Sequence, residues 1–397
     1  MAEPARVVLK AGREKSLRHR HPWVFSGAVE RVEGAPEAGD TVALVAHDGS
    51  PLGTAAYSPS SQIRARVWSF DAAKRIDEAF LAARLQAAVA RRAALLDARN
   101  DSCRLVHAES DGLPGLILDR YGDIGVVQLL SAGAERWRGF WAEAIPRIAG
   151  LRALYERSDA EVRTLEGLAT RAGPMAGEPG AAARIVESGL AYEVDFVHGQ
   201  KTGFFLDQRD NRALAGKLAH GCDVLNAFCY TGGFTLSALA AGARSVLSVD
   251  TSEEALAIGS RNVAANGLDA ASAQWLAADV FELLRKLRDQ GRRFGLIVLD
   301  PPKFAPTEKH VPRAARAYKD INLLAMKLLA PGGCLLTFSC SGAVGPELFQ
   351  KIIAGAAADA RADLVIERRL GASPDHPVSI HFPEGEYLKG LQLRATG

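Results

Sequence analysis

Short apolar segments alternate with helical stretches along residues 183–397, and this alternation constrains the fold more than any other feature of the sequence. The expected strands read "DVLNAF", "SVLSVD", "AQWLAAD", "FGLIVLD", "GCLLTFS", "DLVIERRLG" and "YLKGLQLRA". Strands separated by helices pair in parallel and carry helices on both faces, so the region predicts an open, doubly wound α/β sheet. No helical pattern separates the last two strands, which predict an antiparallel hairpin at one edge.

The remainder of the chain predicts two smaller domains. Residues 1–72 contain short alternating strands and the turn "HDGS", which indicate a small β-barrel. Residues 73–182 begin with an amphipathic helix and continue with a hairpin around Tyr121-Gly122-Asp123, a helix near 134–148 and a strand, which indicate an α+β unit. The Gly/Ala/Pro-rich segment 167–183 is the expected linker to the α/β domain of residues 183–397.

Composition excludes several classes of protein. The 397 residues are 48% hydrophobic and 24% charged, and no apolar run is long enough to span a membrane. The five cysteines form no C-x-x-C pair or tight cluster, so neither a disulfide framework nor a metal site is expected. The N-terminus lacks the pattern of a secretory signal, and we expect a cytoplasmic protein. The net charge of +2 does not by itself indicate nucleic acid.

A glycine-rich turn follows the first strand of the α/β domain, in "VLNAFCYTGGFTLSALAAGA" (224–243). Gly232 and Gly233 allow the backbone to approach a ligand closely. The next strand ends at Asp250, at the spacing of an acid that accepts hydrogen bonds from ribose hydroxyls. The turn is neither G-x-G-x-x-G nor a Walker motif, which favours a nucleoside without a phosphate bridge, and S-adenosylmethionine fits best. The alternative is an ordinary turn in another doubly wound enzyme. The candidate cofactor-binding residues in and after this turn are Asn226, Phe228, Tyr230, Thr231, Gly232, Gly233, Asp250, Ser252, Asp279, Val280 and Asp300.

A second motif, "LIVLDPPKF" (296–304), places Asp300 at the end of a strand and before two prolines. Each proline fixes φ and removes a backbone donor, so the loop is stiff and its carbonyl groups are left available. Asp/Asn-Pro-Pro-aromatic loops of amino-methylating enzymes hold a flipped base by its amino nitrogen, and Lys303 stands here where the aromatic would be. The alternative is a rigid turn without a chemical role.

Several long motifs in the same order resemble the RlmI-like family of S-adenosylmethionine-dependent methyltransferases that form 5-methylcytosine in 23S ribosomal RNA. They include "GREKSLRHRHPWVFSGAV" (12–29), "AESDGLPGLILDRYGD" (108–123), "GQKTGFFLDQRDNR" (199–212), "NAFCYTGGFT" (226–235), "VLDPPKF" (298–304), "TFSCSG" (337–342) and "DHP…PEGEYLKG" (375–390). The resemblance implies a PUA-like β-barrel, a small central α+β domain and a Rossmann-like class I methyltransferase domain. It also implies that Asp207 and Gln208 contact the cofactor.

Cys340 follows an apolar strand, and the resemblance makes it the catalytic nucleophile. Cytosine C5 is a poor nucleophile until a thiolate adds to C6, and this covalent route needs a partly ionised cysteine beside the base. Asp300 would hold the cytosine edge, and Lys303 would stabilise the thiolate or a phosphate. Cys229 and Cys334 are interpreted as packing residues. The base that removes the C5 proton is unassigned, although His376 and His381 are conceivable. A buried structural cysteine is the alternative for Cys340.

The resemblance implies that residues 1–72 form an RNA-binding module, and cations occur there together with an aromatic ring, a mix suited to structured RNA. The candidate RNA-binding residues are Lys10, Arg13, Lys15, Arg20, His21 and Trp23, with a place for Trp23 in the barrel core as the alternative. The expected partner is ribosomal RNA, with 23S as the favoured molecule, and a homodimer would be unsurprising. The competing functions are a ribosomal RNA base N-methyltransferase without a covalent step, a catalytically inactive RNA-binding scaffold, and a dehydrogenase on the same fold.

Overall fold

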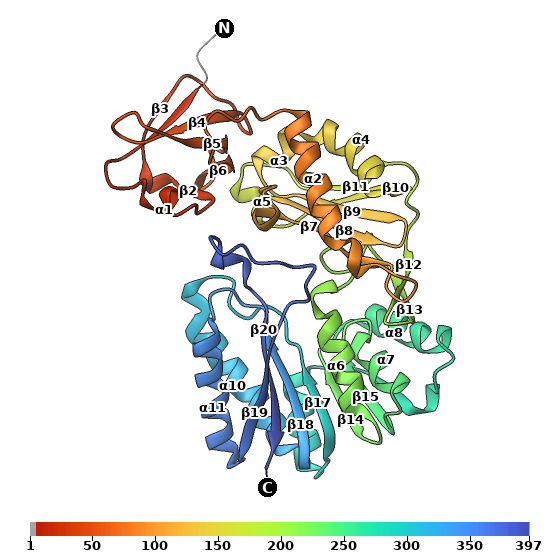
Figure 1. The fold of residues 1–397 in the computed structure, drawn as a ribbon. Coiled ribbons are helices and arrows are strands. Elements are labelled where there is room, and N and C mark those ends of the chain that lie inside the picture. Colours follow the sequence, from red (N-terminus) through yellow and green to blue (C-terminus); the bar gives the residue numbers. More distant parts are fainter. Residues whose placement is uncertain (1–4, 397) are drawn as a thin grey trace. The chain divides into compact units, whose positions relative to one another are not determined.

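The computed structural model describes residues 5–396, which form two compact units (Figure 1). Unit 1 contains the described residues up to Val186 together with Val194–Phe204 and Asp375–Gly385. Unit 2 contains Glu187–Glu193, Phe205–Pro374 and the described residues from Glu386 onward. The predicted α/β domain, residues 183–397, therefore contributes three short segments to unit 1: residues 183–186, Val194–Phe204 and Asp375–Gly385.

The first part of unit 1 is a six-stranded sheet with the order β2-β6-β5-β4-β1-β3. Its elements are β1 (Arg6–Leu9), α1 (Lys15–Arg18), β2 (Trp23–Phe25), β3 (Val29–Glu33), β4 (Thr41–Val45), β5 (Pro51–Tyr57) and β6 (Ile63–Ser69). The predicted turn joins β4 to β5, which pair antiparallel, and Gly49 has a positive φ of 83°. Alternate residues such as Val42 and Leu44 point into one apolar core. Among residues 5–396 the edge strands β2 and β3 do not pair, so the expected barrel is a curled, open sheet.

The second part of unit 1 is a five-stranded sheet with the order β11-β10-β9-β8-β7, covered by helices. Its elements are α2 (Glu78–Arg92), β7 (Ser102–His107), β8 (Leu116–Tyr121), β9 (Ile124–Leu129), α3 (Ala132–Arg136), α4 (Arg138–Ala149), β10 (Ala153–Ser158), α5 (Val162–Leu165) and β11 (Arg171–Ala176). Asp77 caps α2 by accepting the Phe80 N–H, and Gly122 makes the predicted turn between β8 and β9. The expected linker 167–183 is partly wrong, because β11 lies within it and pairs with β10.

The segment Asp375–Gly385 is held to the rest of unit 1 by specific contacts. Arg92 donates to the Asp375 carbonyl oxygen at 3.0 Å, and the Arg104 N–H donates to the Asp375 carboxylate at 2.9 Å. The rings of Trp23 and Phe382 meet edge to face, with centroids 4.7 Å apart. The C-terminal motif that contains this segment therefore has a structural role in unit 1.

Unit 2 contains a seven-stranded sheet with the order β16-β15-β14-β17-β18-β20-β19. Its strands are β14 (Asp223–Ala227), β15 (Ser245–Asp250), β16 (Ala273–Ala277), β17 (Phe294–Leu299), β18 (Leu329–Ser339), β19 (Leu364–Gly371) and β20 (Lys389–Ala395). The first five are parallel, while β20 runs antiparallel to β18 and β19, as the sequence predicts. The hairpin β12 (Ala183–Glu187) and β13 (Leu190–Val194) precedes this sheet.

Helices cover both faces of the unit 2 sheet. Its helices are α6 (Arg209–Ala219), α7 (Gly233–Ala240), α8 (Glu253–Ala265), α9 (Val280–Asp289), α10 (Val311–Lys327) and α11 (Pro346–Ala360). Successive residues of β14 alternate between the faces: Val224 packs with α6 and α7, whereas Leu225 packs with α9, α10 and α11. This doubly wound arrangement leaves the carboxyl ends of the parallel strands as the site for a ligand.

Candidate active site and RNA-binding surface

Four adjacent strands of unit 2 end beside one another at the carboxyl edge of the sheet. In the order β15-β14-β17-β18 they deliver Asp250, the turn after Ala227, Asp300 and Cys340. Val249, Ala227, Leu299 and Thr337 occupy one register row directly below. Three strand spacings separate the first strand from the last, roughly 14 Å, which leaves room for a nucleoside beside a base.

The turn after β14 carries backbone strain of the kind that functional sites retain. Phe228 and Tyr230 have positive φ values of 61° and 49°, although neither is glycine. Two bonds hold the turn: the Cys229 N–H donates to the Val249 carbonyl at 2.9 Å, and the Tyr230 N–H donates to the Asp250 carboxylate at 2.9 Å. The turn is therefore fixed against the end of β15.

Asp250 and Asp279 lie where the sequence predicts. Asp250 accepts from Tyr230 on one oxygen and from the Ser252 N–H at 3.1 Å on the other, so its carboxylate is oriented by two backbone donors. Ser252 also caps α8, and the exposed Asp279 caps α9. A partly exposed carboxylate keeps lone pairs for two vicinal hydroxyls, which agrees with a ribose at this position.

The two glycines of the turn leave space for neighbouring protein side chains. Gly232 has a φ of 76°, and a Cβ there would lie 2.4 Å from the Trp275 ring. A Cβ on Gly233 would lie 2.7 Å from the Arg212 side chain, which is buried and paired with Glu187. Protein side chains therefore fill the space beside both glycines, and the close approach of a ligand to this backbone stays a prediction.

The other predicted cofactor residues divide into buried and accessible groups. Asn226 is fully buried and donates to Thr235 at 2.9 Å, and Thr231 is 3% exposed. Phe228 lies at the edge of an aromatic cluster with Phe281 and Phe304, next to the buried Val280. Apolar rings and an oriented carboxylate beside a strained turn fit the adenosine part of S-adenosylmethionine.

Asp207 and Gln208 are buried in the turn Leu206–Gln208 before α6. The Tyr387 hydroxyl donates to the Asp207 carboxylate at 2.5 Å, and the Ser373 N–H donates to its carbonyl at 2.9 Å. The Gln208 side chain accepts from Asn211 at 2.6 Å. These contacts join the start of α6 to the segments around β19 and β20.

Cys340 is partly buried directly after β18, and its thiol donates to the Pro301 carbonyl oxygen at 3.9 Å. The carbonyl that the proline loop leaves available is thus directed at the thiol. The Asp300 N–H donates to the Ala227 carbonyl at 3.4 Å, so the same loop also contacts the cofactor turn. The structure therefore brings Asp300 and Cys340 to neighbouring loops, as the sequence predicts.

The serines on either side of Cys340 bind a buried tyrosine that the sequence analysis missed. Ser339 donates to the Tyr318 hydroxyl at 2.9 Å, and the Ser341 hydroxyl lies 3.0 Å from the same oxygen. Ser341 also accepts the Ala305 N–H of the proline loop at 3.1 Å. Tyr318 lies on α10 one helical turn after Ala314, facing the core, which is the only signal the sequence offered.

Two lysines differ sharply in their environments near Cys340. Lys303, the predicted catalytic cation, is exposed on the proline loop. Lys389, which the sequence analysis did not consider, is 6% exposed and faces Ser339 across the β18–β20 pair. Its ammonium donates to the carbonyl oxygens of Ser341 and Val344, each at 2.7 Å. Burial lowers the Lys389 pKa to about 8, opposed by the negative charges of Cys340 and Glu386.

The other cysteines contrast with Cys340. Cys334 and Cys229 are buried, as expected of packing residues. Burial raises the Cys334 pKa to about 11, and burial together with the Asp250 charge raises the Cys229 pKa well above its usual value. Both therefore remain neutral thiols at physiological pH. His376, a conceivable base, is buried in unit 1, 3.1 Å from the Asp375 carboxylate, whereas His381 is exposed.

The predicted RNA-binding residues separate into a group at a surface cavity and a group that contacts neighbouring side chains. Arg13 and Lys15 line a cavity of about 580 Å³ together with Ser16, His19 and Phe25, and Lys10 donates to Gly27 at its edge. Phe25, the last residue of β2, is 48% exposed, and the sequence analysis did not consider it.

The second group consists of the exposed Arg20 and the partly buried His21 and Trp23. The indole N–H of Trp23 donates to the Glu109 carboxylate at 2.7 Å, and the Arg66 guanidinium lies over the Trp23 ring. His21 contacts Glu384 at 3.2 Å, and the Arg20 guanidinium lies over the Phe70 ring. Trp23 is thus partly buried outside the apolar core of the N-terminal sheet, and its predicted role in RNA binding stays a prediction.

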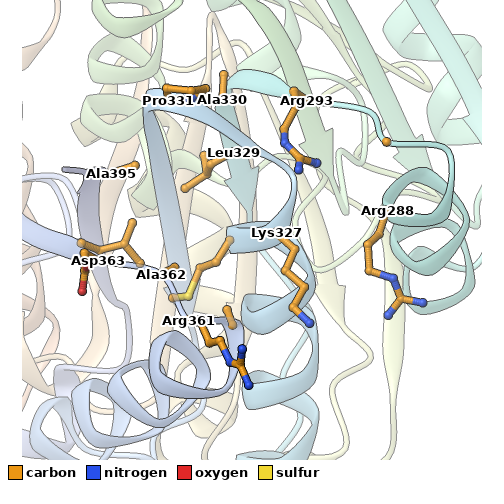
Figure 2. Close-up of a pocket in the computed structure, with 14 residues that line it drawn as sticks. Arg288, Arg293, Lys327, Leu329, Ala330, Pro331, Arg361, Ala362, Asp363 and Ala395 are labelled. Atoms are coloured by element: carbon orange, nitrogen blue, oxygen red, sulfur yellow. The ribbon is translucent and has the colours of Figure 1, made fainter. Parts of the chain in front are cut away.

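A separate cavity of about 500 Å³ lies at the opposite edge of the unit 2 sheet, beside Leu329 and Ala395 (Figure 2). Figure 2 shows four cationic side chains around it, those of Arg288, Arg293, Lys327 and Arg361. Arg288, Lys327 and Arg361 lie at the C-terminal ends of α9, α10 and α11, where cations offset the partial negative charge of the helix carbonyls. We assign no ligand to this cavity.

Neither a cluster of metal ligands nor a membrane-spanning helix is found in the part of the chain that is described. No group of three or more His, Cys, Asp or Glu side chains within residues 5–396 is placed to hold a metal ion. No helix in that range has the length and apolarity needed to cross a membrane.

Family models match both predicted functional regions. A model described as S-adenosylmethionine-dependent methyltransferase matches residues 169–389, and a PUA-like domain model matches residues 7–70. The first covers more than half of the chain and includes every strand end described above. The match supports S-adenosylmethionine as the cofactor, which the sequence analysis expected from the glycine-rich turn and Asp250.

Curated relatives and solved structures agree over nearly the whole chain. The chain is 52% identical to ribosomal RNA large subunit methyltransferase I of Shewanella denitrificans, over 98% of this chain and 99% of the relative. It is 51% identical to the protein of the same name from Escherichia coli, again over 98% and 99%.

Two solved structures share the fold over 98% of this chain and 99% of theirs. One, described as a methyltransferase complexed with SAH, superposes with a TM-score of 0.86 at 22% identity. The other, from Streptococcus mutans, has a TM-score of 0.84 at 21% identity. With its sequence identity to the curated relatives and its two matched domains, the chain belongs to the family of ribosomal RNA large subunit methyltransferase I and is an S-adenosylmethionine-dependent methyltransferase.

Proposed function

We propose that this protein forms 5-methylcytosine in 23S ribosomal RNA, with Cys340 as a covalent nucleophile. The observation that carries the proposal is the placement of the Cys340 thiol beside the Asp300-Pro-Pro loop. That loop follows β17, which lies between β18 and the strand before the cofactor turn. An N-methyltransferase needs no thiol at this position. S-adenosylmethionine supplies an electrophilic methyl group, and the residues of this chain must make C5 able to accept it.

The thiolate of Cys340 adds to C6, breaks the C5–C6 π bond and places its electron pair on C5. C5 then forms its bond to the methyl carbon with that pair, while the methyl–sulfur bond of the cofactor breaks, its electron pair stays on sulfur, and S-adenosylhomocysteine leaves. Loss of the C5 proton to a base returns an electron pair that restores the C5–C6 double bond and expels the thiolate. Asp300 is proposed to bind the N3/N4 edge of the cytosine, and Lys303 to contact a phosphate from its exposed position.

On the cofactor side, Asp250 is proposed to bind the ribose, and Phe228 with Val280 to contact the adenine. Tyr230, Thr231, Ser252 and Asp279 would shape the same site, and Asn226, Gly232 and Gly233 would hold the turn that forms it. Asp207 and Gln208 act through the segment before α6. The site residues of the sequence analysis thus divide into contacting and supporting residues.

The RNA is proposed to contact the groove of Arg13, Lys15 and Phe25. Cations there can bind phosphates, and an exposed aromatic ring can stack on an unpaired base. Lys10 lies at the groove edge and belongs to the same surface. We also propose that the protein acts in the cytoplasm on ribosomal RNA and that a homodimer can form, which light scattering of the purified protein would test.

The deciding experiment uses large-subunit RNA that contains 5-fluorocytidine. A base can remove the C5 hydrogen as a proton but cannot remove a fluorine that replaces it, so the covalent adduct cannot break down. The wild-type enzyme should therefore remain bonded to the RNA and migrate as a larger species on a denaturing gel. Cys340→Ala should give neither this species nor 5-methylcytosine by mass spectrometry. Cys222→Ala, a partly buried cysteine before β14, is the matched control and should behave as wild type. Retention of 5-methylcytosine by Cys340→Ala would overturn the proposal, and N-methylated cytosine would favour the N-methyltransferase.

A further inference from the structure

A buried ammonium group lies beneath the loop that carries Cys340. Lys389 is the first residue of β20 and pairs with Ser339, the last residue of β18. Only 6% of Lys389 is exposed, although lysine is almost never buried without a reason. The pairing with Ser339 in the sheet fixes the backbone position of Lys389 and directs its side chain.

The ammonium binds the backbone on both sides of the turn after Cys340. It donates to the Ser341 carbonyl and to the Val344 carbonyl at 2.7 Å each, and these residues begin and end the tight turn closed by the Val344 N–H to Ser341. Two of its three N–H donors are thereby used. Carbonyl oxygens favour the charged form of the amine, whereas burial disfavours it.

The charged groups near Lys389 are Cys340, Glu386 and Lys303. Tyr318, on the other side of the Cys340 loop, is neutral because burial raises its pKa. Lys303 is exposed to water, which screens its charge. Lys389 is the better placed of the two lysines to act on the sulfur.

We propose that Lys389 is a positioning residue for catalysis: its buried ammonium fixes the Cys340 loop through two carbonyl oxygens and favours the thiolate over the thiol. The inference deepens the proposed function and rests on Cys340 as its nucleophile. An adjacent cation is one of the established ways to increase the thiolate fraction of a cysteine. It replaces Lys303, the cation expected from the sequence, in that role.

The Lys389 pKa of about 8 sets the pH range in which its charge can support the Cys340 thiolate. The charges of Cys340, Glu386 and Lys303 act on Lys389, while Tyr318 beside the Cys340 loop is neutral. Below about pH 8 the amine is charged and supports the thiolate. Above that pH the amine becomes neutral, but a thiol of ordinary acidity then ionises without help. The largest effect of removing the charge is therefore expected at neutral and mildly acidic pH.

The test measures the pH dependence of alkylation of Cys340 by iodoacetamide, followed by mass spectrometry of the Cys340 peptide. It needs neither RNA nor turnover. Lys389→Met should raise the pH of half-maximal alkylation by about one unit, equivalent to tenfold less thiolate at pH 7. Lys389→Gln, which keeps N–H donors but has no charge, should show the same shift. Lys389→Arg, which keeps the charge, should have a midpoint close to that of the wild type.

Two control variants separate the charge of Lys389 from other effects. Lys319→Met removes an exposed lysine paired with Asp359 and should leave the midpoint unchanged. Lys303→Met should shift it by less than a third of a unit. S-adenosylmethionine binding by calorimetry shows that each variant is folded.

An unchanged midpoint in a folded Lys389→Met variant would overturn the inference. A midpoint shift in an enzyme that forms no covalent RNA species would instead retain the role of Lys389 and reject the covalent function.

Discussion

The hydroxyl of Ser341 accepts the backbone N–H of Ala305 at 3.1 Å and lies 3.0 Å from the Tyr318 hydroxyl. This contact joins the loop of Cys340 to the loop of Asp300, which belong to different strands. A thiol and a carboxylate that act on one base must be held in fixed geometry, and a buried hydrogen-bond network achieves this more firmly than exposed contacts.

We expect Ser341→Ala to lower kcat about tenfold while leaving S-adenosylmethionine affinity unchanged, because the two loops lose their link but the cofactor turn does not. The buried Ala305 N–H also loses its acceptor, at a cost of about 1–3 kcal/mol in the free energy of unfolding. Steady-state kinetics and urea denaturation measure the two effects. Ser245→Ala, whose hydroxyl bonds Asp223 at the other end of the sheet, serves as the control. A wild-type kcat in the Ser341 variant would show that the link has no role in catalysis.

Asp250→Asn should weaken S-adenosylmethionine binding by about 10–100-fold, the value of hydrogen bonds to a charged acceptor. Titration calorimetry is the direct measurement. Asp269→Asn alters an exposed acid that caps a surface turn and should bind normally. Equal affinities in the two variants would remove Asp250 from the cofactor site.

Gly232→Ala should destabilise the protein by at least about 2 kcal/mol, since the residue has a φ of 76° and its Cβ would meet Trp275. Adding Trp275→Ala relieves the steric part and not the backbone strain, so only partial recovery is expected. Gly139→Ala is the comparison, because nothing lies within 4 Å of its Cβ position. Full recovery in the double variant would mean that the positive φ costs little.

Phe25→Ala should reduce RNA affinity by roughly 1–3 kcal/mol without lowering thermal stability, because the exposed ring stacks on a base but packs little in the free protein. Leu165→Ala changes a more exposed apolar residue of unit 1 and should bind RNA normally. Arg13→Ala should decrease the slope of log affinity against log salt by about one. Filter binding at several salt concentrations distinguishes these outcomes, and normal binding by Phe25→Ala would place the RNA elsewhere.

The stability of the protein should decline as the pH falls below about 6.5, and His107 should be one cause. Burial, then the charges of Arg104, His376 and Arg92, lower the His107 pKa to about 2, against the opposing charge of Asp375. Between pH 6.5 and 2 the unfolded chain binds a proton that the folded protein does not, so stability is present above this window and is lost as the pH falls through it.

The loss due to His107 is at most about 1.4 kcal/mol per pH unit. Urea titrations at pH 7, 6 and 5 should show a shallower decline for His107→Gln than for wild type, whereas parallel curves would exclude His107 as a cause.

The sequence by itself determined the doubly wound sheet, the order of its motifs and the placement of Asp250, Asp300 and Cys340 at strand ends. These features depend on local alternation of apolar residues and on the rule that parallel strands end at one edge. The same rule could not predict which side chains pack beside Gly232 and Gly233, since these come from β16 and α6.

Tertiary structure alone decided the environment of each side chain. It showed Trp23 partly buried and Phe25 exposed, although they are two residues apart, because the ring of Phe382 packs against Trp23. It also placed Lys389 under Cys340, through the pairing of two strands that are distant in the chain. Charge and burial at a site arise from such long-range contacts, which no local pattern of residues encodes.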